Sequence, residues 1–475
     1  PIDGVVLTIG CDKTTPALLM AASTVDIPSI CLSSGPMMNG YWKGERAGSG
    51  TIVWKARKLL ATGEIDEEEF IKIVVDATTS PGFCNTMGTA TTMNSLAEGL
   101  GMSLPGCAAI PAPLSERIEM SYRTGLRIVE MVKKDLTPSK ILTRKAFENS
   151  IVLNSAIGGS TNAPIHINAI ARHVGVELEI EDWEKIGLEI PMLVNMQPGG
   201  KYLGEDFHRA GGVPAVMNAL LKAGKLHDSA ITVNGKTVAE NYAETTTQDT
   251  DVIRTFQNPM LENAGFIVLK GNIFDSAVMK TSVISDSFRS QYLDKPVSKN
   301  VFEVRAIVFE GPEDYRKRIN DPQLNINVDC ILVIRGCGPV GYPGSAEVVN
   351  MQPPDKLIRE GILELPTLGD GRQSGTSGSP SILNASPESA VGGGLALLKT
   401  GDMLLIDLNQ GSLDVMLDKS ELQKRHDELK TEEIENQTPW QEIYRSTVGQ
   451  LAGGGIIELA AKYQRIRKTL PRHSH

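Results

Sequence analysis

The sequence changes its pattern of secondary structure near Thr232, and this change constrains the fold more than any other feature. Before it, strand-like stretches such as Val5–Ile9 and Ile27–Leu32 alternate with helix-like stretches such as Thr89–Leu100. Such alternation is typical of an α/β domain with a largely parallel sheet. After it, short β-rich segments follow one another between Gly, Pro, Asn and Asp turns, which predicts a barrel or sandwich. These segments are Ala230–Val233, Phe266–Leu269, Val301–Phe309, Cys330–Ile334 and Met403–Asp407.

We therefore expect an N-terminal α/β domain with a largely parallel sheet, followed by a β-barrel-like C-terminal domain. The chain has 475 residues, a length that suits two domains. We place the first at residues 1–255 and the second at 256–475. The second should end in a helix over Thr447–Arg467, followed by the basic tail Lys468–His475.

Charge and composition exclude several classes of protein. The chain has 47 Lys and Arg against 57 Asp and Glu, a formal net charge of −10, which argues against coating nucleic acid or an anionic membrane. No apolar run approaches the ~20 residues that a membrane helix requires, so a membrane protein is excluded. The 6 cysteines form no CxxC pair and no disulfide framework. This indicates a reducing compartment, and we expect a cytoplasmic protein, with a mitochondrial location left open.

Two loops combine a cysteine with polar residues at the start of a helix. Gly10–Thr14 follows the first strand, a position at which α/β proteins bind ligands, and its Cys11 and Asp12 suit different metals. Pro81–Thr92 carries Cys84 among hydroxyls and glycines that could bind an anion. Alternatively, both are structural turns with buried cysteines.

Three further segments are rich in glycine and polar residues. Gly158–Asn162 precedes His166, and Gly336–Glu347 ends in a carboxylate, although both are also consistent with structural turns. Gly369–Pro380 has no large apolar side chain, so it cannot stabilise a core. It offers backbone freedom, hydroxyls and one Arg, which together suit a small polar anion. It matches neither a P-loop nor a Gly-x-Ser-x-Gly elbow.

These blocks, in this order, resemble the family of iron–sulfur dehydratases that includes dihydroxy-acid dehydratase and 6-phosphogluconate dehydratase. The matching segments span most of the chain, and Ser374–Asn384 resembles the branch that dehydrates sugar acids, the pentonates xylonate and arabinonate. The segments that carry the resemblance are Gly10–Thr14, Pro81–Met93, Asn154–Ala169, Gly341–Glu347 and Thr367–Pro387.

The resemblance implies a [2Fe–2S] cluster and a Mg²⁺ ion. Cys11 and Cys84 match two of the three cysteines that hold the cluster. Asp12 and Glu347 match Mg²⁺ ligands, and Lys13 matches a lysine that is carbamylated in the family and so becomes a third oxygen ligand. The third cysteine and a further acidic ligand precede the matched region in the family, so we expect this chain to lack an N-terminal part.

Ser374 matches the serine proposed as the base, with Thr376 beside it. The implied reaction removes a proton from C2 and hydroxide from C3 of a sugar acid, and gives a 2-keto-3-deoxy acid. The resemblance also implies an active site between the two domains and a homodimer or homotetramer. Two alternatives stay open, namely a dehydratase of branched-chain 2,3-dihydroxy acids and an inactive or truncated member of the family.

Overall fold

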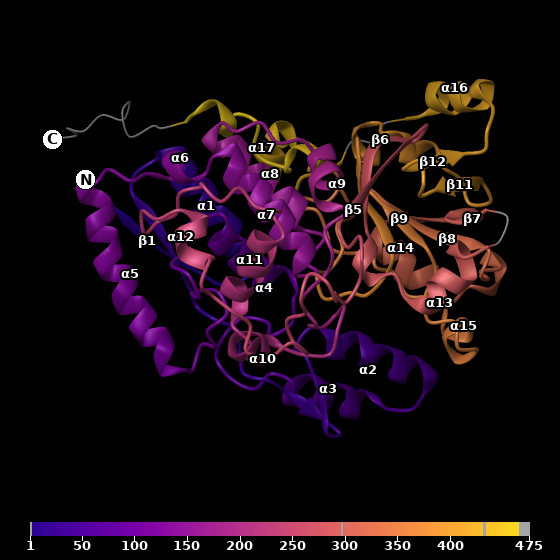
Figure 1. Ribbon diagram of the computed structural model, residues 1–475. Helices are drawn as coiled ribbons and strands as arrows, with labels where there is room; N and C mark the ends of the chain where they lie inside the picture. Colours follow the sequence, from indigo (N-terminus) through magenta and orange to yellow (C-terminus); the bar gives the residue numbers. More distant parts are fainter. Residues whose placement is uncertain (1, 296–297, 431–433, 465–475) are drawn as a thin grey trace. The chain divides into compact units, whose positions relative to one another are not determined.

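The computed structural model describes residues 2–295, 298–430 and 434–464 (Figure 1). The chain forms two compact units. Unit 1 comprises the chain up to Ala56, Glu67–Gly265 and the segment from Leu459, and unit 2 comprises Arg57–Asp66 and Phe266–Glu458. The proposed domain division at residue 255 stays a prediction. The predicted tail Lys468–His475 lies outside the described residues.

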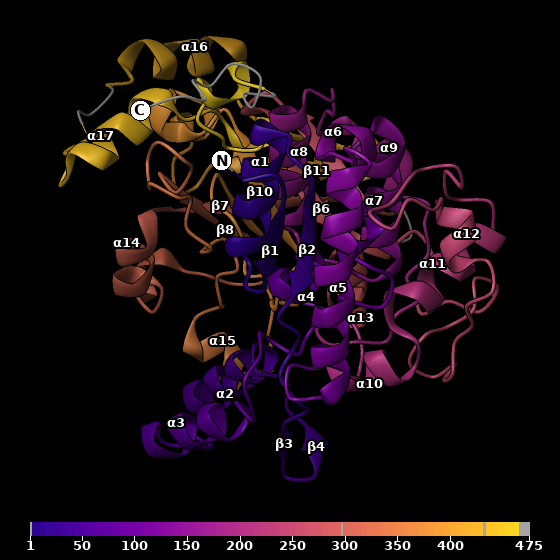
Figure 2. The same cartoon turned by 90° about the vertical axis from the view of Figure 1, so that its left-hand side faces the viewer.

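Unit 1 contains a two-stranded parallel sheet whose strands flank the first helix. β1 (Val5–Ile9) pairs with β2 (Ser29–Ser33), and α1 (Thr14–Val25) connects them. The second sheet is the hairpin of β3 (Tyr41–Trp42) and β4 (Glu45–Arg46). α5 (Ser115–Lys133) packs against β1 and β2, and it runs alongside them in Figure 2.

The remaining described elements of unit 1 are helices. They are α2 (Thr51–Thr62), which crosses the boundary between the units, α3 (Glu67–Asp76), α4 (Thr89–Gly99), α6 (Pro138–Ile141), α7 (Arg144–Ala156), α8 (Ala163–Val174), α9 (Glu181–Gly187), α10 (Gly204–Arg209), α11 (Gly212–Lys222) and α12 (Val238–Tyr242). Every residue of α4 is buried.

The largely parallel sheet expected for the first half is not confirmed, because its described part contains only the β1–β2 parallel pair. Helices such as α4 take the buried positions that further strands would occupy. The strand expected at Ala230–Val233 is absent from the described structure, where only a single bridge joins Ile231 to Thr237.

Unit 2 is built on a closed barrel of eight strands, which confirms the expected barrel. The strand order is β10-β6-β5-β12-β11-β7-β8-β9, and β9 and β10 are parallel neighbours. The strands are β5 (Phe266–Gly271), β6 (Phe274–Lys280), β7 (Val301–Glu310), β8 (Cys330–Arg335), β9 (Thr367–Gly369), β10 (Ser381–Ser386), β11 (Met403–Asp407) and β12 (Ser412–Val415).

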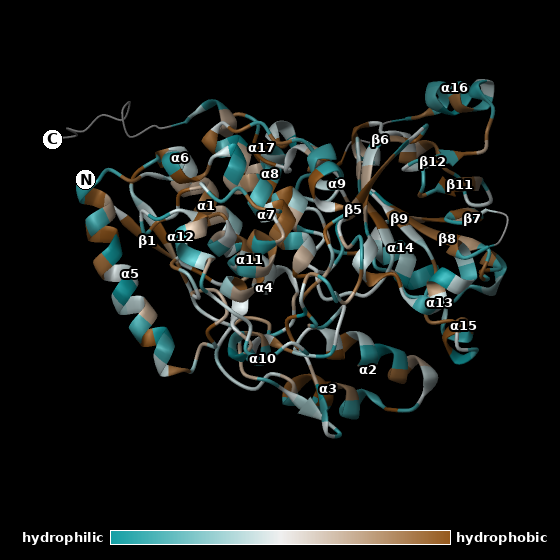
Figure 3. Ribbon diagram, in the orientation of Figure 1, coloured by the Kyte–Doolittle hydropathy of each residue, from teal (hydrophilic) through white to brown (hydrophobic). Residues whose placement is uncertain are grey.

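The barrel core consists of side chains that alternate along these strands. Phe302, Ile331, Leu404 and Leu413 are each at most 4% exposed and belong to one buried cluster. Figure 3 accordingly shows β5 and β8 as mostly hydrophobic and α16 as mostly hydrophilic. The helices of unit 2 are α13 (Asp286–Phe288), α14 (Gly311–Arg318), α15 (Asp355–Arg359), α16 (Lys419–Glu428) and α17 (Pro439–Thr447).

The helix expected over Thr447–Arg467 is not found in the described part of that range, which ends at Gln464. α17 ends at Thr447, and the chain up to Gln464 continues in short 3₁₀ turns at Leu451–Gly453 and Ala460–Lys462. Gly454 and Gly455 both have positive φ, a conformation that glycine adopts readily and that ends a helix. None of the described helices combines the length and the apolar character needed to cross a membrane.

The barrel gives a first prediction. Leu404 is 0% exposed, whereas its neighbour Met403 on β11 is 38% exposed. Leu404→Ala should lower the free energy of unfolding of unit 2 by about 2–5 kcal/mol, because it leaves a cavity. Met403→Ala should change it by less than about 1 kcal/mol. Urea unfolding of both variants measures the difference, and equal losses would contradict the assignment of Leu404 to the barrel core.

Candidate functional site

The first candidate loop lies between β1 and α1. The Asn94 side chain on α4 donates to the Gly10 carbonyl at 2.6 Å and to the Ala90 carbonyl at 2.8 Å, and so ties the loop to a buried helix. A Cβ on Gly10 would collide with the Ser34 hydroxyl, so a larger residue there would force Ser34 to move. The loop therefore holds Cys11, Asp12 and Lys13 at the carboxyl end of β1.

Asp12 and Lys13 form an ion pair in this loop. Lys13 Nζ lies 2.6 Å from Asp12 Oδ2, and the side chains are 52% and 30% exposed, respectively. Burial raises the pKa of Asp12, but the hydrogen bond and charge of Lys13 outweigh it and hold that pKa below its usual range. Asp12 is therefore an anion at neutral pH, and it holds a cationic group.

The structure brings Cys11 and Cys84 close together. Cys84 lies in the loop before α4, where the Thr91 hydroxyl donates to its carbonyl at 2.9 Å. Burial raises the pKa of Cys11, and the charges of Asp12 and of Cys84 raise it further. Cys11 is exposed and Cys84 half-buried. The other four cysteines are buried, so these two thiols are the accessible ones.

Hydroxyl and amide groups connect the starts of α4 and α8. Thr89 Oγ1 lies 2.8 Å from Ser160 Oγ and accepts from Asn162 Nδ2 at 2.9 Å, and all three residues are buried. The loop at Gly158–Asn162 thus meets the loop that carries Cys84. The nearby hydroxyls of Thr86 and Thr161 are buried, with no hydrogen-bond partner in the described structure. Buried polar atoms without partners are typical of places where a polar ligand or water binds.

Glu347 ends the glycine-rich loop Gly336–Glu347, which follows β8 in unit 2. Arg372 Nη1 lies 3.1 Å from Glu347 Oε1, and the two side chains are 7% and 26% exposed. Arg372 also donates from Nε to the Ser345 carbonyl at 2.7 Å and from Nη2 to the Gly344 carbonyl at 3.3 Å. One guanidinium therefore fixes the backbone before Glu347 and the carboxylate itself.

Ser374 and Thr376 lie together in the loop between β9 and β10. Their hydroxyl oxygens are 3.0 Å apart, and the Thr376 N–H approaches Ser374 Oγ at 3.4 Å. The Ser374 N–H donates to Asn350 Oδ1 at 3.1 Å. Donors close to Ser374 Oγ would stabilise an alkoxide there.

The other serines of this loop have different surroundings. The Ser381 hydroxyl accepts from Thr367 at 2.8 Å and donates to Ser379 at 3.3 Å, and Ser381 is 2% exposed. Ser377 is also buried, and its hydroxyl accepts from the Ser379 N–H at 3.1 Å. Ser374 and Thr376 are both half-buried, so a ligand can reach them.

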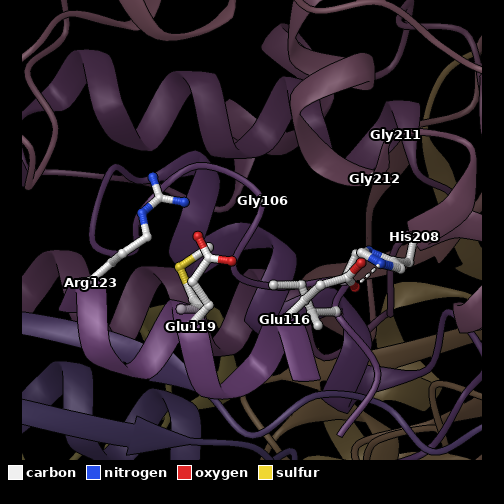
Figure 4. A pocket seen from close by; sticks show the side chains of 10 residues that line it. Gly106, Glu116, Glu119, Arg123, His208, Gly211 and Gly212 are labelled. Carbon is white, nitrogen blue, oxygen red and sulfur yellow. Dashed lines mark hydrogen bonds and ion pairs between the residues drawn. The ribbon is translucent and has the colours of Figure 1, made fainter. Parts of the chain in front are cut away.

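A pocket of about 280 Å³ in unit 1 contains none of the predicted site residues (Figure 4). His208 Nε2 lies 2.9 Å from Glu116 Oε2 at its wall, and Glu119 and Arg123 project from the same helix, α5. In the described part of the chain, no group of three or more His, Cys, Asp or Glu is arranged to hold a metal. In unit 1 the predicted residues form two pairs, Cys11 with Cys84 and Asp12 with Lys13. In unit 2 Glu347 is the single predicted metal ligand.

Sequence reasoning missed the residues that hold these loops. Asn94, Asn350 and Glu388 carry key hydrogen bonds but lie far along the chain from the loops that they contact. Asp370 and Arg372 belong to the Asp-Gly-Arg segment, for which the sequence indicates anion binding rather than contacts with a neighbouring loop. α4 itself combines Thr, Asn and Ser with apolar residues, so no sequence signal marks Asn94 as a buried contact.

Comparison with known proteins identifies the family. Residues 1–241 match the family description "Dihydroxy-acid/6-phosphogluconate dehydratase N-terminal", and residues 251–455 match its C-terminal counterpart. A "D-xylonate dehydratase" of Caulobacter vibrioides is 58% identical over 475 residues, 100% of this chain and 80% of the relative. The chain therefore belongs to the dihydroxy-acid/6-phosphogluconate dehydratase family.

Two further relatives show the range of the family. An "L-arabinonate dehydratase" of Rhizobium leguminosarum is 47% identical over 425 residues, 90% of this chain and 72% of the relative. A "Dihydroxy-acid dehydratase" of Caldanaerobacter subterraneus is 40% identical over 425 residues, 89% of this chain and 74% of the relative.

The contacts of Arg372 give a second prediction. Arg372→Lys keeps the charge but cannot make three directed hydrogen bonds at once. Losing hydrogen bonds to a charged group costs ~1.5–3 kcal/mol. Exchange of the backbone amides of Val349 and of residue 372 should therefore accelerate roughly 10–100-fold. Hydrogen exchange measures this, with Arg316→Lys on the exposed face of α14 as the control. Unchanged exchange would show that Arg372 does not fix the loop.

Proposed function

We propose that this protein is a sugar-acid dehydratase that converts a pentonate, such as xylonate or arabinonate, to a 2-keto-3-deoxy acid. The observation that carries the proposal is the 58% identity to a "D-xylonate dehydratase" over the whole chain. The 47% identity to an "L-arabinonate dehydratase" points the same way. The expected homodimer or homotetramer and the cytoplasmic location stay predictions.

We further propose that Cys11 and Cys84 are ligands of a [2Fe–2S] cluster. The two thiols are accessible, and they are close enough for the charge of one to raise the pKa of the other. Sulfur donors of this kind suit iron–sulfur chemistry. The residue types and their proximity fit the group, and the described residues supply two of the thiolates that it needs.

Asp12, Lys13 and Glu347 are the proposed ligands of Mg²⁺. The Lys13 ammonium contacts the carboxylate on which a cation would bind, so a charged Lys13 competes with Mg²⁺. A carbamate on Lys13 would reverse that charge and add an oxygen donor, the kind of ligand that Mg²⁺ prefers. Glu347 is presented by Arg372, and its carboxylate remains 26% exposed.

Ser374 and Thr376 are the proposed catalytic residues, and they act together with the proposed Mg²⁺ and cluster ligands. When bound, Mg²⁺ supplies Lewis-acid stabilisation of negative charge, and the cluster supplies a Lewis-acidic iron for the departing hydroxyl. Ser374 Oγ accepts the C2 proton of the substrate. A free serine is too weak a base for this step, so it depends on neighbours that stabilise its alkoxide. The Thr376 N–H and hydroxyl lie beside Ser374 Oγ and are suited to that role.

A dehydratase of branched-chain 2,3-dihydroxy acids is the second candidate. It is supported by the 40% identity to a "Dihydroxy-acid dehydratase". The higher identities to sugar-acid dehydratases favour the first candidate. An inactive family member is a weaker alternative, because all seven proposed residues are present in the chain: Cys11, Asp12, Lys13, Cys84, Glu347, Ser374 and Thr376.

A substrate panel tests the proposed function. The protein, reconstituted with iron, sulfide and Mg²⁺ under anaerobic conditions, should form 2-keto-3-deoxy acids from xylonate or arabinonate. A branched-chain 2,3-dihydroxy acid should turn over at least about tenfold more slowly by kcat/KM, since missing hydroxyl contacts cost transition-state binding. Detection of the 2-keto acid products measures both. A preference for the branched-chain acid would favour the second candidate, and no turnover of either would favour an inactive member.

The role of Ser374 gives a fourth prediction. Ser374→Ala should lower kcat by ~10²–10⁴, the range for loss of a general base, while substrate affinity changes little. Ser379→Ala is the matched control in the same loop and should be mild. The cluster absorption and Mg²⁺ content should persist in both variants. Near-normal turnover by Ser374→Ala would place the base elsewhere.

A further inference from the structure

The loop from Gly336 to Glu347 is rich in Gly and Pro and is fixed by polar contacts. Its first two N–H groups donate to Asp370, from Gly336 to Oδ2 at 3.1 Å and from Cys337 to Oδ1 at 2.9 Å. Asp370 is 0% exposed. A second buried carboxylate, Glu388, accepts hydrogen bonds from two N–H groups further along the loop, those of Val340 and Gly341.

Glu388 is 0% exposed and contacts the middle of this loop. Its Oε1 accepts from the Val340 N–H at 2.9 Å, and its Oε2 accepts from the Gly341 N–H at 2.8 Å. A Cβ on Gly338 would lie 2.5 Å from Glu388 Oε2, so glycine is required there for the carboxylate to approach. Burying a carboxylate is costly, and these N–H groups offset that cost only while the loop keeps this conformation.

The rest of the loop is hydrogen-bonded to the part that Glu388 holds. The Tyr342 N–H donates to the Gly338 carbonyl at 2.9 Å, and the Ser345 N–H donates to the Tyr342 carbonyl at 2.7 Å. The Ser345 hydroxyl donates to the Cys337 carbonyl at 3.1 Å. Displacement at Val340 and Gly341 would therefore move Glu347 as well.

We propose that Glu388 is a positioning residue, which holds the Gly336–Glu347 loop in the conformation that presents Glu347 to a divalent cation. The inference rests on the proposed function, in which Glu347 is a Mg²⁺ ligand. Glu388 does not touch the metal or the substrate in this role. It acts through the backbone of the loop.

Gln450 supports the carboxylate of Glu388 from the C-terminal segment. Its Nε2 donates to Glu388 Oε1 at 3.1 Å, and its Oε1 accepts from the Glu388 N–H at 2.7 Å. The Arg445 side chain on α17 also donates to the Val340 carbonyl, at 2.9 Å. The segment after α16 thereby braces the loop, which gives the C-terminal part of unit 2 a role in the candidate site.

The test compares Glu388→Gln with the full parent protein. Glutamine has the same shape, but its NH₂ group would face one of the two loop N–H groups, so the loop should loosen. Titration with MgCl₂, followed by calorimetry, should show Mg²⁺ affinity ~10–100-fold weaker, as for other residues that orient metal ligands. Amide exchange at Val340 and Gly341 should accelerate, and raised Mg²⁺ should restore part of the lost turnover. Glu303→Gln, an exposed carboxylate on β7, is the matched control.

Gln450→Leu tests the same role if Glu388→Gln fails to fold. It should weaken Mg²⁺ binding in the same direction but less. Unchanged Mg²⁺ affinity in the folded variant would overturn the proposal, and so would a parent protein that binds no Mg²⁺. If the parent binds Mg²⁺ but dehydrates no sugar acid, the proposed function fails while the metal titration still decides the role of Glu388.

Discussion

The carboxylate of Asp370 is fully buried and accepts hydrogen bonds from Gly336 and Cys337 in one loop and from Ser389 in another. It thereby ties the loop after β8 to the segment after β10, and buried apolar side chains such as Val349 and Leu365 complete the packing of the loops of unit 2. The loops lie at the ends of barrel strands, which anchor them at each side. Backbone N–H groups inside a protein need partners, and buried carboxylates supply them here.

Much of the fold could be predicted from local pattern. The strands β1, β7, β8 and β11 begin where the sequence indicates, because each is a mostly apolar segment bounded by turn residues. Gly158–Asn162, one of the glycine-rich segments of the sequence, forms the turn between α7 and α8. The barrel and the family are likewise confirmed.

The remainder depends on contacts between residues far apart in sequence. Alternating strands and helices do not reveal how many strands join one sheet, and the described part of unit 1 pairs only two in parallel. The expected C-terminal helix fails because Gly454 and Gly455 outweigh the apolar residues around them. The sequence brought together Cys11 and Cys84 only through the family resemblance. The contacts of Glu388 and Asn350 span 47 and 24 residues, respectively, and no local pattern encodes them.

The pairing of β9 with β10 limits how the connection between these two strands, residues 370–380, can vary in length. The two strands are parallel neighbours, so the chain between Gly369 and Ser381 must return along the length of β9 before β10 begins. This connection is the segment that carries Ser374, and it also completes the ring of strands. Shortening it would open the barrel, whereas lengthening it would cost only a little loop entropy. Substitutions and insertions in this connection therefore leave the ring of strands closed, whereas a large deletion would break the β9–β10 pairing.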